Sequence, residues 1–221
     1  MREGIRLFKG GKYEKALEAL LKVEVPPEQY PEQAYYLGLS YAKLEQFDEA
    51  LLYLEQVAAS DLDFARIFQG RLIIGYIYAV TERYRLAEFE FNQLLEDGYE
   101  SPKVYAALAF VLFKQDKTAQ SISQLEKALE LDPDNPNALN SLGFILADKE
   151  IRVGVALQYC RRAYDQNPHN PAYQDSLGWA QFKCGNIREA VRYLSMARKQ
   201  LPGDPELERH WSVVSRAAEK V

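Results

Sequence analysis

Two stretches, "NALNSLGFILADK" at residues 137–149 and "PAYQDSLGWAQFK" at residues 171–183, repeat one phrase. Both contain Ser-Leu-Gly followed by an aromatic residue, which is Phe144 in the first and Trp179 in the second. Apolar residues recur in both at the spacing of an α-helix. Because glycine inside a helix costs about 1 kcal/mol relative to alanine, the repeated glycine must gain something at that position.

The same pair, an aliphatic residue followed by a small one, recurs from Leu37-Gly38 onward, and Gly4 belongs to a shortened first copy. The small members are separated by 34 to 37 residues, and each is followed by a second small residue 12 or 13 places later. The first set is Gly4, Gly38, Gly75, Ala109, Gly143 and Gly178, and the second is Ala16, Ala50, Ala87, Ser121, Ala156 and Ala190. A period of this size indicates stacked helical repeats rather than one closed core.

Each copy is predicted to form two helices that touch at these small residues. Asn135 and Asn170, each followed by proline, are typical of a helix start. Gly11, Gly98 and Gly185 mark turns. A small side chain on one helix lets the backbone of its partner approach, so we expect close packing to offset the cost of the glycine.

This pattern resembles the tetratricopeptide repeat (TPR) family, in its bacterial style. An aromatic residue precedes alanine by three places at Tyr13, Phe47 and Tyr84, and prolines follow repeats at Pro133, Pro168 and Pro202. The resemblance covers essentially the whole chain. It implies an all-α fold, a right-handed α-solenoid or superhelix of six helix-turn-helix repeats with a C-terminal capping helix, in a single domain of residues 1–221. The predicted repeats are 1–29, 30–63, 64–100, 101–134, 135–169 and 170–203, and the predicted capping helix is 204–221.

Several places depart from the repeat pattern. The first repeat has a truncated leading helix, the third a longer connection around residues 58–64, and the fifth one extra residue around residues 148–153. Val153 and Ile187 stand where the aromatic residue is expected. In the capping helix a stripe is predicted to cover the last repeat; it consists of Leu207, Trp211, Val214, Ala218 and Val221. Trp211 is therefore predicted to be a core residue.

Composition excludes several classes of function. The net charge of −5 and pI of about 5.3 argue against a nucleic-acid partner. No run of apolar residues is long enough to insert into a membrane. Cys160 and Cys184 lack metal or redox spacing and are predicted to be buried free thiols, whereas His169 and His210 are predicted to be exposed. With no phosphate-binding loop or nucleophile motif, we expect neither an enzyme nor a metal or other cofactor.

In TPR proteins one stripe of each first helix lines a concave groove that holds an extended or helical peptide. The resemblance places protein-binding residues three before, one after and four after the small residue. They are Tyr35, Leu39, Leu72, Tyr76, Phe110, Phe113, Asn140, Phe144, Asp175, Trp179 and Phe182. We expect ligand binding to centre on the bulkier C-terminal half, with Asn140 and Asp175 orienting a peptide backbone or a basic side chain. The Lys, Asn and Arg set that clamps a C-terminal carboxylate in some TPR domains is absent. The alternative for each aromatic residue is packing between neighbouring helices.

The resemblance implies a non-catalytic scaffold or adaptor that binds a peptide or helix of a partner protein of unknown identity. The alternative is a structural, self-assembling subunit of a larger, envelope-associated complex that uses its ends or outer face. An uncovered edge at Ile5 and Phe8 would favour self-association. A cytoplasmic location is expected, or a periplasmic or envelope-associated one if a leader has been removed.

Overall fold

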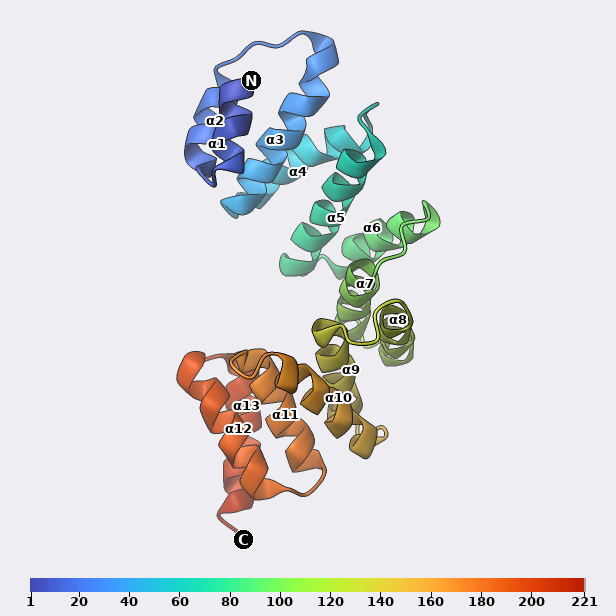
Figure 1. The fold of residues 1–221 in the computed structure, drawn as a ribbon, viewed down its shortest axis with the longest axis vertical. Helices are drawn as coiled ribbons and strands as arrows, with labels where there is room; N and C mark the ends of the chain where they lie inside the picture. Colours follow the sequence, from blue (N-terminus) through green and yellow to red (C-terminus); the bar gives the residue numbers. More distant parts are fainter. Residues whose placement is uncertain (221) are drawn as a thin grey trace. The chain divides into compact units, whose positions relative to one another are not determined.

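The computed structural model describes residues 1–220, and this range contains thirteen α-helices, one short 3-10 helix and no strand (Figure 1). Each repeat has a first helix and a second helix. The first helices are α1 (Arg2–Lys9), α3 (Tyr30–Lys43), α5 (Phe64–Val80), α7 (Pro102–Lys114), α9 (Pro136–Asp148) and α11 (Pro171–Lys183). The second helices are α2 (Tyr13–Leu21), α4 (Phe47–Ala58), α6 (Tyr84–Glu96), α8 (Thr118–Leu131), α10 (Val153–Gln166) and α12 (Ile187–Gln200). A 3-10 turn, η1 (Pro27–Gln29), precedes α3, and α13 (Pro205–Ala218) is the terminal helix.

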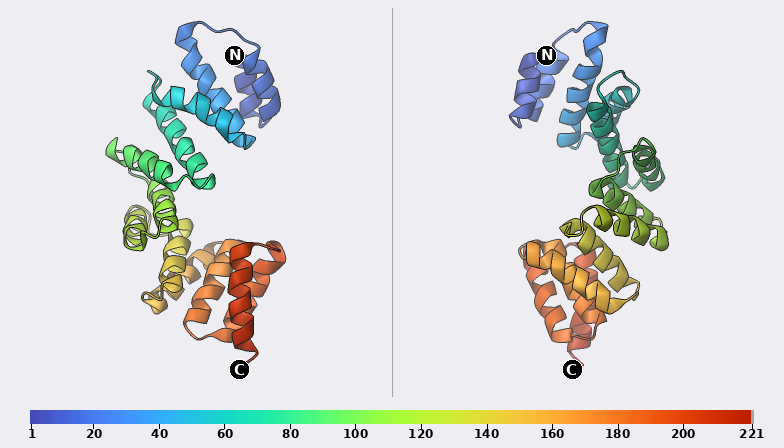
Figure 2. Two further views of the ribbon diagram at one scale, coloured as in Figure 1. Left: turned by 180° about the vertical axis from the view of Figure 1, so that it is seen from behind. Right: turned by 45° about the vertical axis from the view of Figure 1, so that its right-hand side comes forward.

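The predicted all-α fold of six helix pairs plus a terminal helix is confirmed, and Figure 2 shows the two helices of each pair side by side. The helices form two compact units, residues 1–100 with three pairs and residues 101–220 with three pairs and α13. Each unit is described by itself below. The single domain and the right-handed superhelix concern both units together and stay predictions. Val221, the last member of the predicted stripe, lies outside the described residues.

Close approach of the paired helices explains the repeated glycine. A β-carbon at Gly178 would lie 2.8 Å from Cγ and 3.1 Å from the backbone nitrogen of Leu194. At Gly143 it would lie 2.9 Å from the backbone nitrogen of Cys160. The predicted contact is therefore confirmed, with one refinement: the glycine faces the residue one turn beyond the predicted small residue. In the pair where alanine replaces glycine, the Ser121 hydroxyl donates to the carbonyl oxygen of Ala109 at 2.7 Å.

First and second helices begin in different ways. From α5 onward, each first helix and α13 start after a side chain that accepts a hydrogen bond from the backbone of the first turn. These capping residues are Asp63, Ser101, Asn135, Asn170 and Asp204. No second helix has such a cap among the described residues, because each follows directly on a tight turn.

The turn between the two helices of a pair requires a left-handed backbone. Gly11 and Gly185 supply it with φ of 73° and 82°, as predicted. Four pairs use an acidic residue at the same place, with φ between 56° and 60°. These residues are Glu45, Glu82, Asp116 and Glu150. Gly98, with φ of 83°, lies instead in the connection from α6 to α7.

Two of the three predicted departures are confirmed, and one is misplaced. The helix α1 has only 8 residues, and the extra residue of the fifth repeat lies in the turn, where Arg152 also has a left-handed φ of 48°. The surplus of the third repeat was predicted in the connection but lies in α5, which has 17 residues against 13 in α7. Its additional first turn is held in place because Phe64 and Phe68 pack against the ring of Tyr99.

The terminal helix α13 starts like a first helix. Its Asp204-Pro205 matches the Asn170-Pro171 that opens α11, and Leu207 and Val214 are buried as predicted. Trp211 was predicted to be a core residue, but it is only half-buried, with the Arg198 guanidinium 5.4 Å from its ring centre. Aligning the two prolines places Trp211 at the position of Leu177, which is fully buried. Within the described residues no second helix follows α13, so its ring lacks the equivalent cover.

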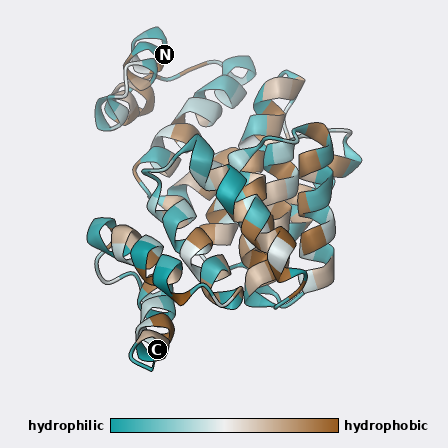
Figure 3. Ribbon diagram, turned by 60° about the horizontal axis from the view of Figure 1, so that its bottom comes forward, coloured by the Kyte–Doolittle hydropathy of each residue, from teal (hydrophilic) through white to brown (hydrophobic). Residues whose placement is uncertain are grey.

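Hydrophobic and hydrophilic positions alternate along the helices, which is the pattern expected of helices with one packed face (Figure 3). Among residues 1–220, no helix combines the length and the apolar character needed to cross a membrane.

Candidate functional site

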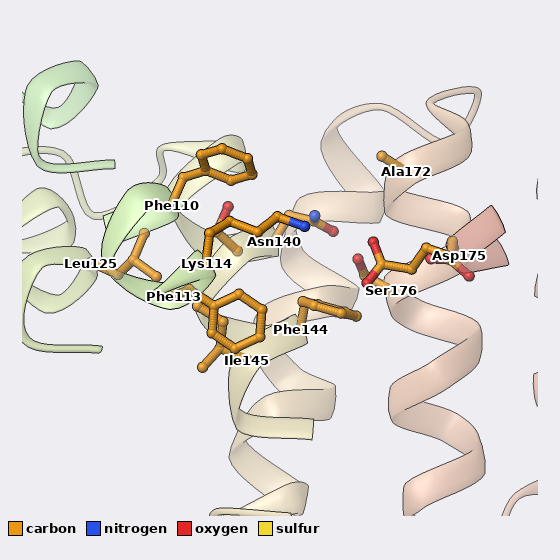
Figure 4. A pocket seen from close by; sticks show the side chains of 12 residues that line it. Phe110, Phe113, Lys114, Leu125, Asn140, Phe144, Ile145, Ala172, Asp175 and Ser176 are labelled. Carbon is orange, nitrogen blue, oxygen red and sulfur yellow. The ribbon is translucent and has the colours of Figure 1, made fainter. Parts of the chain in front are cut away.

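An open cavity of about 210 Å³ lies in the unit of residues 101–220 (Figure 4). Five helices contribute to its lining, which consists of Phe110, Phe113 and Lys114 from α7, Leu125 from α8, Asn140, Ser141, Phe144 and Ile145 from α9, Ala172, Asp175 and Ser176 from α11, and Glu206 from α13. We call this cavity the α9 pocket. It brings together five of the predicted binding residues, Phe110, Phe113, Asn140, Phe144 and Asp175.

Aromatic rings form one side of the α9 pocket. Phe113 meets Phe144 edge-on, with ring centres 6.2 Å apart, and both rings are half-buried. Phe110 is 47% exposed, and the Lys114 ammonium lies 5.6 Å from its ring centre. A second ammonium, that of Lys149, lies 5.3 Å from the ring of Phe113. The ring faces at this pocket therefore already attract cations.

Hydrogen-bond acceptors form the other side. The side-chain oxygen of Asn140 is buried and has no hydrogen-bond partner within the described part of the chain. The Asp175 carboxylate is 14% exposed, and one of its oxygens lies 2.8 Å from Nδ1 of His210. Figure 4 shows Lys114 extending from α7 toward Asn140, with Asp175 and Ser176 facing them from α11. Glu206, with 53% of its side chain exposed, stands at the rim.

His210 was predicted to be exposed, and this prediction is wrong: its side chain is fully buried. It stacks on Trp179 with ring centres 4.3 Å apart, and its Nε2 lies 2.9 Å from the Arg209 guanidinium. Because a guanidinium only donates, Nε2 accepts and Nδ1–H donates to Asp175. The burial of His210 depends on contacts with Asp175 and Trp179 on another helix, α11, so no local pattern in the sequence marks it. His169 is exposed, as predicted.

Trp179 and Phe182 do not line the α9 pocket. Trp179 is only 4% exposed, since His210 stacks on it while the cations of Lys183 and Arg209 lie 4.8 Å and 5.4 Å from its ring centre. Phe182 is stacked beside it at 5.5 Å. The surroundings of Trp179 are those of a packing residue that supports α13.

The unit of residues 1–100 has a separate, more apolar groove of about 310 Å³. Leu39 and Tyr76 line it, with Phe8, Phe47 and Val80 among their neighbours. Of the other predicted residues, Tyr35 is buried and its hydroxyl donates to Gln69 at 2.7 Å, and Leu72 is half-buried outside the groove lining. The predicted stripe is thus divided between two grooves and the packing that surrounds them.

The histidine and cysteine side chains within residues 1–220 can be compared with what a metal or catalytic centre needs. No group of three or more His, Cys, Asp or Glu side chains there is arranged to hold a metal ion. The Arg209 guanidinium donates a hydrogen bond to Nε2 of His210, the ring nitrogen that would have to accept a proton if His210 were a general base. Burial raises the pKa of the Cys160 and Cys184 thiols, which disfavours reactive thiolates. The burial of both thiols was predicted; Cys160 is buried, but Cys184, the residue that follows the end of α11, is only partly so.

Sequence reasoning missed the polar residues that complete the α9 pocket, chiefly Lys114 and Glu206. A signal for Glu206 was present: aligning Pro205 with Pro171 places Glu206 at the position of Ala172, which also lines the pocket. Lys114 follows Phe110 by one helical turn and so shares its face.

Comparisons with known proteins agree with this architecture. Family models for the tetratricopeptide repeat match residues 35–103 and 152–209, and a TPR repeat model matches residues 111–149. The TPR repeat-containing protein PA4667 of Pseudomonas aeruginosa is 30% identical over 168 residues, which are 76% of this chain and 28% of that protein. The chain therefore spans less than a third of that relative's length.

Two solved structures show the same fold at low sequence identity. YrrB, a TPR protein, is 22% identical with a TM-score of 0.59, over 95% of this chain and 98% of that one. The APC/C hetero-tetramer Cut9-Hcn1 is 14% identical with a TM-score of 0.76, over 96% of this chain and 41% of the other. The matched models, the repeat period and the six helix pairs agree, and the chain belongs to the tetratricopeptide repeat family, whose helical solenoid is a scaffold for protein interaction and is generally non-catalytic.

Proposed function

We propose that this chain is a non-catalytic interaction module that holds a segment of a partner protein in the α9 pocket. The observation that carries the proposal is the buried, unpartnered side-chain oxygen of Asn140 in an open cavity beside aromatic rings. A buried acceptor without a partner costs about 1–3 kcal/mol, and a donor on a bound segment would remove that cost.

The aromatic side of the pocket supports the same proposal. Half-buried rings in a concave surface are typical anchors for a bound chain, because they add apolar area with little loss of side-chain freedom. YrrB is described as having an unusual peptide-binding site, and Cut9 is seen in complex with Hcn1. Both descriptions concern those proteins, and they make peptide or protein binding the first function to test here.

The proposal is tested by selecting binders from a phage-displayed library of random 12-residue peptides on the full chain. We expect selected peptides to lose most of their affinity for Phe113→Ala, because truncating an interface anchor typically costs about 2 kcal/mol or more. Phe113 is the better choice than Trp179 because it lines the pocket and leaves the stacking under α13 intact.

Phe89→Ala is the matched control, since Phe89 is 57% exposed and lies outside both grooves. Peptides that bind Phe113→Ala as well as they bind the unchanged chain would refute the pocket as the site. Thermal melts of both variants separate lost binding from lost folding.

A second candidate, self-assembly through the outer face, is favoured by a different observation. Leu86 and Phe89 lie three residues apart on α6 and are 48% and 57% exposed. The edge predicted at Phe8 is partly covered, because its ring contacts Tyr13 and Tyr36 at 5.5 Å and 5.6 Å. Sedimentation velocity over a wide concentration range should reveal a dimer that Phe89→Ala weakens; a monomer at every concentration would rule this candidate out.

A further inference from the structure

We infer that the α9 pocket selects a cationic side chain, a guanidinium or an ammonium group, on the partner segment. This inference rests on the proposed function and adds the chemistry of the ligand. Its basis is the sign and placement of the polar groups around the cavity.

Acceptors converge on the pocket from three helices. Asn140 on α9 offers a buried oxygen without a partner, Asp175 on α11 has a second carboxylate oxygen beyond the one bound to His210, and Glu206 on α13 stands at the rim. A guanidinium presents five N–H donors in one plane and an ammonium presents three. Such a group would satisfy the Asn140 oxygen and the carboxylates together, which a neutral amide side chain could do only in part.

The aromatic side of the pocket suits the same ligand. The ammonium groups of Lys114 and Lys149 lie 5.6 Å and 5.3 Å from the rings of Phe110 and Phe113. A cation over an aromatic face is attracted by the negative charge density of the ring. The apolar part of an arginine or lysine side chain would also cover Phe144.

His210 gives the acidic side a fixed geometry. It donates from Nδ1 to Asp175 at 2.8 Å and is itself held by stacking on Trp179 and by the Arg209 guanidinium. Asp175 is therefore held in place before a ligand arrives, which lowers the entropy cost of binding. In this arrangement His210 is a positioning residue for the pocket.

Lys114 is the cation that lines the pocket, so its removal tests whether the ligand is cationic or anionic. A cationic ligand is repelled by Lys114 and attracted by Glu206, whereas an anionic ligand has the opposite response to both. Lys114→Met keeps the length of the side chain and removes its charge. Opposite effects of Lys114→Met and Glu206→Gln on one ligand therefore report the sign of the charge that the pocket prefers.

The probes are three acetylated and amidated pentapeptides of sequence Ala-Leu-X-Leu-Ala, in which X is Arg, Gln or Glu. They are titrated into the full chain while the side-chain amide signal of Asn140 is followed by NMR. We expect the Arg peptide to bind most tightly and to shift that signal. Glu206→Gln should weaken it about two- to fivefold and Lys114→Met should strengthen it by a similar factor, as for partly exposed charge pairs.

Two variants control for general charge effects. Glu208→Gln removes the same charge from α13 at a residue that pairs with Arg198, and Lys103→Met removes a cation from α7 outside the pocket. Both should leave the affinity for the Arg peptide unchanged.

Equal affinity for the Arg and Gln peptides, tightest binding of the Glu peptide, or no binding of any of the three would overturn the inference. The library selection described above uses peptides of every charge. Selected peptides that bind through Phe113 without a basic residue would therefore end the cation inference and leave the proposed function standing.

Discussion

A single missing side chain decides how closely two paired helices approach. At Gly143 the added β-carbon would meet backbone atoms, the nitrogen of Cys160 at 2.9 Å and the carbonyl oxygen of Ala156 at 3.0 Å. Backbone atoms cannot rotate away as a side-chain tip can. The glycine therefore sets the distance between α9 and α10.

We expect Gly143→Ala to lower the free energy of unfolding by about 1–3 kcal/mol, the usual range for overpacking a core. Gly154→Ala is the control in the same helix pair, because a β-carbon there meets nothing within 4 Å. That change should be neutral or stabilise by up to about 1 kcal/mol. Urea denaturation of both variants measures the difference; equal stabilities would show that the helices separate easily.

His210 has a packing role that the other histidine, His169, lacks. We expect His210→Ala to destabilise the fold by about 2–4 kcal/mol, since it removes a buried ring from Trp179 and a hydrogen bond from Asp175. His169→Ala changes an exposed side chain and should alter stability by less than about 0.5 kcal/mol. Thermal unfolding of the two variants tests this, and similar melting temperatures would argue against the buried pair.

At the residue scale, the sequence predicts packing better than it predicts turns and polar pairs. The glycine contacts follow from a repeated small residue in an apolar helix. The left-handed turn at Asp116 does not, because aspartate adopts that conformation only when the flanking helices impose it. The contact between Asp175 and His210 joins residues 35 positions apart, and no local pattern in the sequence marks it.

At the scale of the helix, the first helices from α5 onward start after a side-chain cap, and the second helices do not. The caps at Asn135 and Asn170 were predicted from the sequence because asparagine followed by proline is a local signal for a helix start. The surplus residues before α5 were misplaced, because both a loop and a longer helix accommodate "AASDLDF" and only the contacts of Phe64 and Phe68 with Tyr99 favour the helix.

Removing a cap should cost more than removing the residue at an uncapped start. In Asn170→Ala the backbone N–H of Ala172 loses an acceptor at 2.9 Å, and we expect a loss of about 1 kcal/mol. Gln46 precedes α4 without capping it, so Gln46→Ala should cost little. Chemical denaturation distinguishes the two; equal effects would mean that α11 does not depend on its cap.

The contact between α5 and α6 has a predicted pH dependence. Burial raises the pKa of Glu90, although the nearby Arg71 lowers it in part. The folded state therefore favours the protonated carboxyl, and its contribution to stability is full below the unfolded pKa and is lost as pH rises through the folded one. We expect Glu90→Gln to be more stable than the unchanged chain at pH 7 and equal to it at pH 3. A variant that is less stable at pH 7 would show that the Arg71 pair dominates.

At the scale of the whole molecule, the repeat period predicted the number of helix pairs, because each pair is formed by one contiguous segment of the sequence. The pocket was harder, since it draws residues from five helices. The predicted stripe located Phe110, Phe113, Asn140, Phe144 and Asp175 because they occupy repeated positions. Glu206 occupies a position where the other repeats have unrelated residues. Lys114 occupies one where Lys9, Lys43 and Lys183 stand in other repeats, so periodicity marks it as part of the repeat and not as part of a pocket.

Local stability should differ along the array. Neither α1 nor α3 has a side-chain cap, and α1 has only 8 residues, whereas α7, α9 and α11 are capped. We expect amide hydrogen exchange to show residues 1–60 opening at lower free energy than residues 100–200, as in repeat arrays with a weak end. Uniform protection across both ranges would contradict this prediction.

The start of α13 has a consequence for engineering. Because Asp204 and Pro205 open it as Asn170 and Pro171 open α11, it offers a template on which another second helix could be grafted. A copy of the segment 184–200 placed after it, with Trp211→Leu and Ser212→Gly to restore the Leu-Gly pair, would extend the array by one module. The half-buried face of α13 at Trp211 is thus a place where repeats can be added, and the number of repeats can be chosen by design.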